Sequence, residues 1–188
     1  MMKKSFKALS FVAGTLLLAG CAVKEYRESC PCRLVLDFSE VDTAVVRSAD
    51  LYVTVPDGYV FTDHVRCESF DRDYSVEVPR TQLLVNAVSN AGDMYSQSGL
   101  HIPLGQDCPP LYMHSSLIDA DCEQWCEVVR MHKNHCRMTV AVLSDEGYSP
   151  GLKLVSNVNG YDPAGKPVNG GFEVSHRPDE SGICTFVL

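Results

Sequence analysis

Nine cysteines and six histidines are the residues of this 188-residue chain best suited to chemistry. The first cysteine, Cys21, ends the run Leu17-Leu18-Ala19-Gly20-Cys21. An even number of cysteines remains after it, and thiols of this kind form disulfides, bind metals or act as nucleophiles. We take these as disulfide candidates: Cys30, Cys32, Cys67, Cys108, Cys122, Cys126, Cys136 and Cys184.

The densest group of such residues has the composition of a zinc site: Cys122, Cys126, His132, His135 and Cys136. Its spacing is wrong, because the segment from Cys126 to His132 is too short for a finger loop. Disulfides are the better prediction for an exported chain, and we expect no metal and no cofactor. Eight cysteines allow on the order of 100 pairings, among which the sequence cannot choose. Cys30 and Cys32 flank Pro31, an arrangement too close and too stiff for them to bond each other.

No catalytic signature accompanies these thiols. The chain has no Gly-x-Ser-x-Gly nucleophile motif and no phosphate-binding glycine loop. His64 and His101 lie near turn residues without ligand spacing. We therefore predict that the protein is not an enzyme.

The segment around Cys21 reads as a lipoprotein signal. Three lysines form a positive n-region, residues 8–18 are mostly apolar, and the small residues Ala19 and Gly20 precede the cut. The alternative is a transmembrane helix, which needs roughly 20 apolar residues. Lys24 and Glu25 arrive too soon for that. We predict a signal peptide over residues 1–20, acyl chains such as palmitate on Cys21, and a polar tether over residues 21–29.

Charge and length restrict the function further. The formal net charge of the chain is −8. Loss of the signal peptide, which carries three lysines and no acid, brings it to −11 over 168 residues. Phosphate would repel such a protein, so nucleic-acid binding is not expected. The length suits one ordinary domain or two small ones.

The first half of the chain predicts short strands. Residues 33–38 alternate apolar and polar side chains, which is typical of a strand with one buried face. Pro56-Asp57-Gly58 has the chemistry of a turn between two strands. Short strands at this spacing indicate an antiparallel β-sandwich. The predicted strands are 33–38, 50–55, 59–62, 74–78 and 82–88.

The second half is less regular. Glycines and prolines over residues 94–115 predict a loop or linker. Residues 119–131 fit either a helix or a loop followed by a strand over 127–131, and we favour the strand. Its expected antiparallel partner is 136–143, with a turn at Lys133-Asn134. Further strands are expected at 152–158, 172–174 and 184–188, with a loop over 159–165. We predict a first sandwich domain over 30–112 and a second, shortened one over 113–188.

Several motifs follow the lipoprotein signal in a recognisable order. They are Cys30-Pro31-Cys32, a strand entering an Asp-Gly turn over 51–58, the apolar strand 83–90, the Cys-x-Met-x-Val strand from Cys136, and the segment 157–165. This order resembles the FimB/Mfa-type fimbrium anchoring subunits, lipoproteins of the Bacteroidales type V pilus system. The chain is shorter than that family's pattern and carries more cysteines.

The resemblance implies an all-β fold of tandem transthyretin-like antiparallel sandwiches. It also implies a cell-surface lipoprotein, held in the outer membrane by the lipid on Cys21, that anchors a fimbrium (pilus). Its partners would be fimbrial structural subunits joined by strand addition. The alternative is a surface lipoprotein whose sandwich binds a glycan or another protein through exposed aromatics such as Tyr59 or Tyr95.

Overall fold

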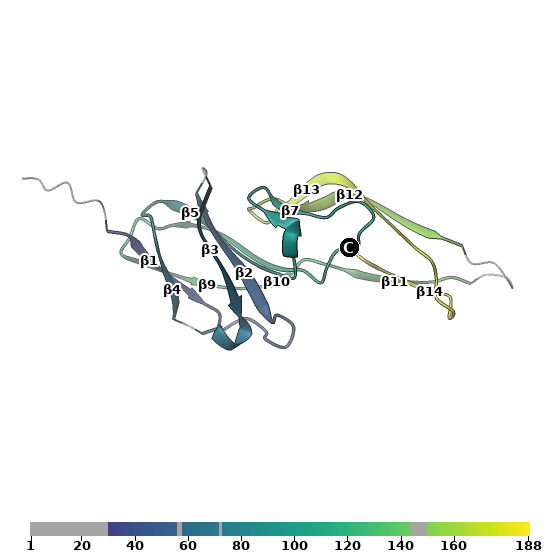
Figure 1. Ribbon diagram of the computed structural model, residues 1–188, viewed down its shortest axis with the longest axis horizontal. Coiled ribbons are helices and arrows are strands. Elements are labelled where there is room, and N and C mark those ends of the chain that lie inside the picture. The colour runs from purple at the N-terminus through teal and green to yellow at the C-terminus, as the bar shows by residue number, and fades with distance from the viewer. Residues whose placement is uncertain (1–29, 56–57, 72, 144–149) are drawn as a thin grey trace, which may run out of the picture. The chain divides into compact units, whose positions relative to one another are not determined.

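The computed structural model describes residues 30–188, apart from 56–57, 72 and 144–149, and the side chains of residues 59 and 60. Within this range Pro31–Leu188 form one unit, and Figure 1 labels most of its strands. Its regular elements are β-strands and two single-turn 3₁₀ helices, η1 (Cys67–Ser69) and η2 (Gly92–Met94). The all-β fold class is therefore confirmed. The predicted signal peptide, the tether and Cys21 lie outside the described residues.

Two sheets enclose the first hydrophobic core. A three-stranded sheet has the order β4 (Tyr74–Val78), β1 (Cys32–Asp37), β9 (Gln124–Val128). A five-stranded sheet has the order β10 (His132–Lys133), β8 (Tyr112–Asp119), β5 (Gln82–Ser89), β2 (Ser48–Val55), β3 (Gly58–Arg66). Side chains at every second position point into this core, as the period of a strand requires. Examples are Leu34 and Leu36 on β1, and Leu51 and Val53 on β2.

Two further sheets enclose a second core. A four-stranded sheet has the order β13 (Pro167–His176), β12 (Leu152–Tyr161), β7 (Gly99–His101), β6 (Tyr95–Ser96). β11 (Arg137–Ala141) and β14 (Ile183–Val187) form a two-stranded antiparallel sheet. Phe172, Val174, Cys184 and Phe186 are buried between these sheets.

The predicted loop over residues 94–115 is wrong. This segment contains part of η2, β6, β7 and the start of β8. β8 is an interior strand that pairs with β5 over its whole length, from Gln82↔Asp119 to Ser89↔Tyr112. Its two serines and His114 interrupt the alternation of apolar and polar residues by which a strand is recognised in a sequence. The sequence therefore did not indicate a strand here, and the pairing with β5 is known only from the structure.

The region after residue 119 contains a strand rather than a helix, as favoured, but the strand covers Gln124–Val128 instead of 127–131. The turn predicted at Lys133-Asn134 is wrong, because Lys133 lies in β10, and so is the predicted partner of the strand. β9 runs parallel to β1, with Arg33↔Gln124 and Asp37↔Val128 as the ends of the register. The strand at Arg137–Ala141 pairs with β14 instead. The loop expected from residue 159 begins later, because β12 continues through Tyr161.

The two cores do not follow one another along the chain. Tyr95, Leu100 and Ile102 belong to the second core, whereas Ile118 and Val129 belong to the first. The chain therefore passes from the first core to the second before residue 95, returns to the first by Ile118, and passes to the second again after Val129.

Candidate functional site

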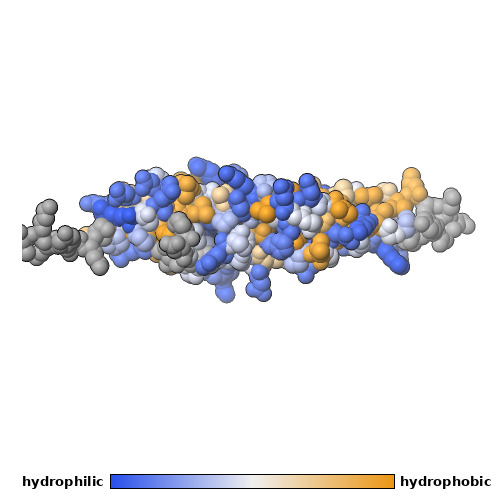
Figure 2. All heavy atoms as spheres, turned by 90° about the horizontal axis from the view of Figure 1, so that it is seen from above, coloured by the Kyte–Doolittle hydropathy of each residue, from blue (hydrophilic) through white to orange (hydrophobic). Residues whose placement is uncertain are grey.

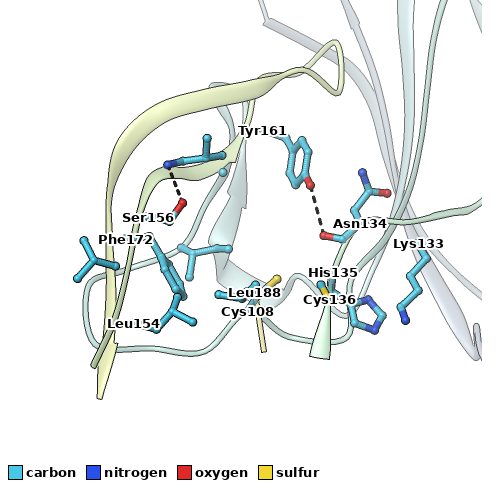
Figure 3. Close-up of a pocket in the computed structure, with 14 residues that line it drawn as sticks. Cys108, Lys133, Asn134, His135, Cys136, Leu154, Ser156, Tyr161, Phe172 and Leu188 are labelled. Atoms are coloured by element: carbon cyan, nitrogen blue, oxygen red, sulfur yellow. Dashed lines mark hydrogen bonds between the residues drawn. The ribbon is translucent and has the colours of Figure 1, made fainter. Parts of the chain in front are cut away.

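An apolar groove of about 550 Å³ opens into the second core. Leu154, Phe172 and Leu188 line it with aliphatic and aromatic carbon, and Tyr161 and Asn134 face it at the other end (Figure 3). Phe172 is almost completely buried in the second core, whereas Leu154 and Leu188 are only partly buried. The groove is thus an opening into the core. Its remaining lining residues are Ile102, Cys108, Lys133, His135, Cys136, Val155, Ser156, Val158 and Gly160.

An open strand edge borders this groove. β12 pairs with β13 along most of its length. On its other side β7 pairs only with Gly160 and Tyr161, and the Ile102 N–H donates to the Asn159 carbonyl at 2.8 Å. Within the described ranges no strand pairs with Leu152–Val158 on that side. Backbone N–H and C=O groups along such an edge are available to a further strand.

The groove also has a polar rim. The Tyr161 hydroxyl donates to the Asn134 carbonyl at 3.4 Å, and His135 Nδ1 lies 2.9 Å from the Leu111 carbonyl. The backbone groups of Cys136 and Leu188 exchange two hydrogen bonds, at 2.7 and 2.8 Å. These bonds fix the rim residues, so the groove is held open by the fold around it.

Two predicted cysteines lie at the groove, but in different environments. Cys108 is buried, and its thiol donates to the Pro109 carbonyl at 3.2 Å. Burial, together with the charge of Asp107, raises the pKa of the Cys108 thiol to about 11. Cys136 is exposed. Cys108 therefore behaves as a small apolar core residue near neutral pH.

The structure places the other predicted cysteines apart from the groove. Cys184 is buried on β14, Cys67 is half-buried in η1, and Cys30 and Cys126 are exposed. Cys32 is buried at the start of β1, and its sulfur lies 3.9 Å from that of Cys122.

The cysteines and histidines with the composition of a zinc site do not come together in the structure. Cys122 contacts Cys32, Cys126 is exposed on β9, and His132 is exposed on β10. His64 and His101 instead bond Asp50 (2.6 Å) and Asn159 (3.1 Å). Across the described part of the chain, no three His, Cys, Asp or Glu side chains gather in a metal-binding arrangement.

Tyr95, one of the two aromatic residues named for ligand binding, does not lie on the surface. Tyr95 is buried in the second core and packs against Tyr52, with ring centroids 4.6 Å apart. The expectation that Tyr95 is exposed is therefore wrong, and the side chain of Tyr59 lies outside the described residues. Figure 2 shows hydrophobic residues in separate patches on one face of a largely hydrophilic surface. Exposed apolar residues include Leu104, Leu117, Leu143, Val155, Val168 and Ile183.

Sequence reasoning missed the groove. The segment Leu152, Leu154, Ser156 and Val158 alternates as an ordinary strand with one buried face. Nothing in that pattern shows that the facing sheet has only two strands. The structure itself marks the groove, because these four side chains, which face the core, are only partly buried.

The described residues contain no helix long and apolar enough to cross a bilayer. No protein-family model and no curated sequence matches the chain.

Two crystal structures share the fold. One is a candidate adhesin from Bacteroides ovatus, with a TM-score of 0.56 and 13% identity over 85% of this chain and 67% of that one. The other is a candidate adhesin from Bacteroides thetaiotaomicron, with a TM-score of 0.50 and 14% identity over 85% of this chain and 71% of that one. At these identities the likeness concerns the fold alone.

Proposed function

We propose that this protein is a non-catalytic cell-surface lipoprotein that anchors a fimbrium, held in the outer membrane by the lipid on Cys21. The fimbrial structural subunit adds an extended strand to the open edge of β12. The observation that carries the proposal is this edge, which has no partner strand over Leu152–Val158 among the described residues and lies beside an apolar groove.

Strand addition fits the chemistry of this site. The backbone of β12 offers hydrogen bonds to an incoming strand, and the groove receives alternate apolar side chains of that strand. Val155 lies on β12, lines the groove and is 66% exposed. Leu154 lines it from the same strand and is only partly buried. A bound strand would cover Leu154 on the inner face of β12 and would flank Val155 on the opposite face.

The anchor role is also supported by two independent features. The sequence predicts a lipoprotein signal ending at Cys21. The fold is shared with two proteins from Bacteroides that are described as candidate adhesins. The first feature supports attachment to a membrane, and the second supports a role in surface adhesion.

A charged residue in the groove tests the strand-addition step. Val155→Glu places a carboxylate where the incoming strand packs, and burying an unpaired charge costs several kcal/mol. Val168→Glu is the matched control, because Val168 is 40% exposed on β13, in the same sheet, and does not line the groove. Cells of the native host carrying each variant are compared by electron microscopy and by immunoblotting of shed fibres.

We expect Val155→Glu to release at least tenfold more fimbriae into the medium than Val168→Glu, since about 1.4 kcal/mol is a factor of ten. Because Val155 and Val168 are both exposed, neither substitution should change the urea concentration at the midpoint of unfolding appreciably. Fimbriae retained equally by both variants would refute attachment at this groove. Cys21→Ala tests the membrane step separately, and fibres that stay on those cells would refute lipid anchoring.

The same groove favours a second candidate, a binding site for a small glycan or peptide ligand. Its volume is within the range of ligand pockets, roughly 300–1,000 Å³. It combines an apolar floor with an aromatic wall at Tyr161 and a polar rim at Asn134. Binding of the purified chain on a glycan array that is lost in Tyr161→Ala would support this role. No binding across a broad array would count against it.

A further inference from the structure

The sulfur atoms of Cys32 and Cys122 lie 3.9 Å apart, although 90 positions separate the two residues in sequence. Cys32 is the first residue of β1 and is fully buried. Cys122 stands just before β9, the parallel neighbour of β1, and packs against the first core. The Arg33 N–H donates to the Glu123 carbonyl at 2.9 Å, so the backbone beside both cysteines is already held together.

At 3.9 Å the two sulfurs are in van der Waals contact and are not bonded. The bond in a disulfide is about 2.05 Å long, so the sulfurs need to approach by roughly 2 Å. Cys122 is only partly buried, and a change of its side-chain rotamer moves its sulfur while the backbone of β9 stays in place. Cys126, the next cysteine along the chain, is exposed on β9.

We propose that the fold pairs Cys32 with Cys122 as a disulfide in an oxidising environment. The Cys122 thiolate attacks the disulfide of an exported thiol–disulfide oxidoreductase, forms a mixed disulfide and releases one thiolate of the oxidant. Cys32 then loses its proton and attacks the Cys122 sulfur, which releases the second thiolate. The two cysteines together lose two protons and two electrons, and the oxidant is reduced to a dithiol.

The order of these steps follows from exposure. Burial raises the pKa of the Cys32 thiol, and its hydrogen bond with Cys122 acts in the same direction. Cys122 is the more accessible of the two and therefore meets the oxidant first.

The cross-link has a mechanical consequence, which rests on the proposed function. A fimbrium bound at β12 pulls against the tether that begins at Cys21. The disulfide carries this force directly from Cys32 to Cys122. Residues 33–121, which include most of β1 and all of β2–β8, are then outside the loaded path. Without the bond, unfolding of this segment releases roughly 300 Å of extended chain, at about 3.3–3.6 Å per residue.

The pairing is tested on the purified full chain, equilibrated in a buffer of reduced and oxidised glutathione. Free thiols are blocked by alkylation, the protein is digested without reduction, and the peptides are identified by mass spectrometry. We expect one linked peptide pair joining Cys32 to Cys122. The Cys126→Ser control should keep this link, and Cys122→Ser should lose it.

A Cys32 that is alkylated as a free thiol in the folded, oxidised chain, or that is bonded to another cysteine, overturns the proposal. Pulling the chain by its two ends gives a second readout. The oxidised protein should release roughly 300 Å less chain on full unfolding than the same protein after reduction, and the Cys122→Ser variant should show no such difference. Equal release before and after reduction overturns the proposal as well. Both tests use isolated protein, so they are independent of whether fimbriae attach at the groove.

Discussion

Replacing Phe38 and Phe172 by alanine, one at a time, tests whether the second core is open at the groove. Both side chains are 2% exposed, so the two substitutions remove the same amount of buried apolar surface. Their surroundings differ. Phe38 stacks on Phe70 with centroids 4.8 Å apart and meets Tyr74 edge-on at 5.9 Å, inside the first core. Phe172 lines the groove.

The difference in environment predicts a difference in cost. Phe→Ala substitutions in cores destabilise by about 3–5 kcal/mol, depending on the cavity left behind. Phe38→Ala should cost about 5 kcal/mol, because it leaves a closed cavity and removes two aromatic contacts of about 0.5–1.5 kcal/mol each. Phe172→Ala should cost about 3 kcal/mol, because the space it leaves joins an existing opening and adds little closed cavity.

Equilibrium unfolding in urea measures both values. Far-UV circular dichroism follows the whole chain, and fluorescence of Trp125, the single tryptophan, follows the first core. Phe38→Leu is the control, and it should recover most of the stability lost in Phe38→Ala because it refills most of the volume. A cost for Phe172→Ala equal to or above that for Phe38→Ala would refute the reasoning, because it would mean that Phe172 lies in a closed core.

Two further predictions concern single positions. Gly160→Ala should destabilise the chain by about 2 kcal/mol or more in urea unfolding, because its Cβ would lie 1.9 Å from the Leu100 carbonyl oxygen; Gly171→Ala, with nothing within 4 Å, should stay within about 0.5 kcal/mol. A matching loss at both positions would contradict the close approach of β7 to β12. Burial lowers the pKa of His114, although the charge of Glu127 opposes the shift. Below about pH 6.5 the unfolded chain therefore binds a proton at this residue more readily than the folded chain does. Stability should therefore fall between pH 7.5 and 5.5, and less steeply in His114→Gln; an unchanged slope would refute this.

The surroundings of His114 explain that pH dependence. Its Nδ1 accepts the Arg130 N–H at 3.2 Å, which leaves the proton of the neutral ring on Nε2. Nε2 lies 3.4 Å from a Glu127 carboxylate oxygen but has no partner in hydrogen-bond geometry. The charge of Glu127 favours the protonated ring, whereas the charges of His132 and Arg130 oppose it. Desolvation is the largest of these effects.

The sequence alone was enough to predict the elements whose pattern is local. The strand near residues 74–78 alternates clearly, 50–55 is rich in β-branched and aromatic residues, and 82–88 is a more continuous apolar run; the structure contains them as β4, β2 and β5. The lipoprotein signal ending at Cys21 and the expectation of a non-enzyme also rest on local residue types. They remain predictions, since the described residues begin at Cys30.

Only the tertiary structure decided which strands are neighbours. The period of two in a strand tells which side chains share a face, but it is the same for a parallel and an antiparallel partner. The pattern of β9 therefore did not predict that it pairs with β1, a strand about 90 residues earlier in the chain. The approach of Cys32 to Cys122 follows from that pairing, so the sequence could not select it among the possible cysteine pairs. The groove beside β12 depends on a strand that is missing from its edge, and an absence of this kind leaves no local pattern in the chain.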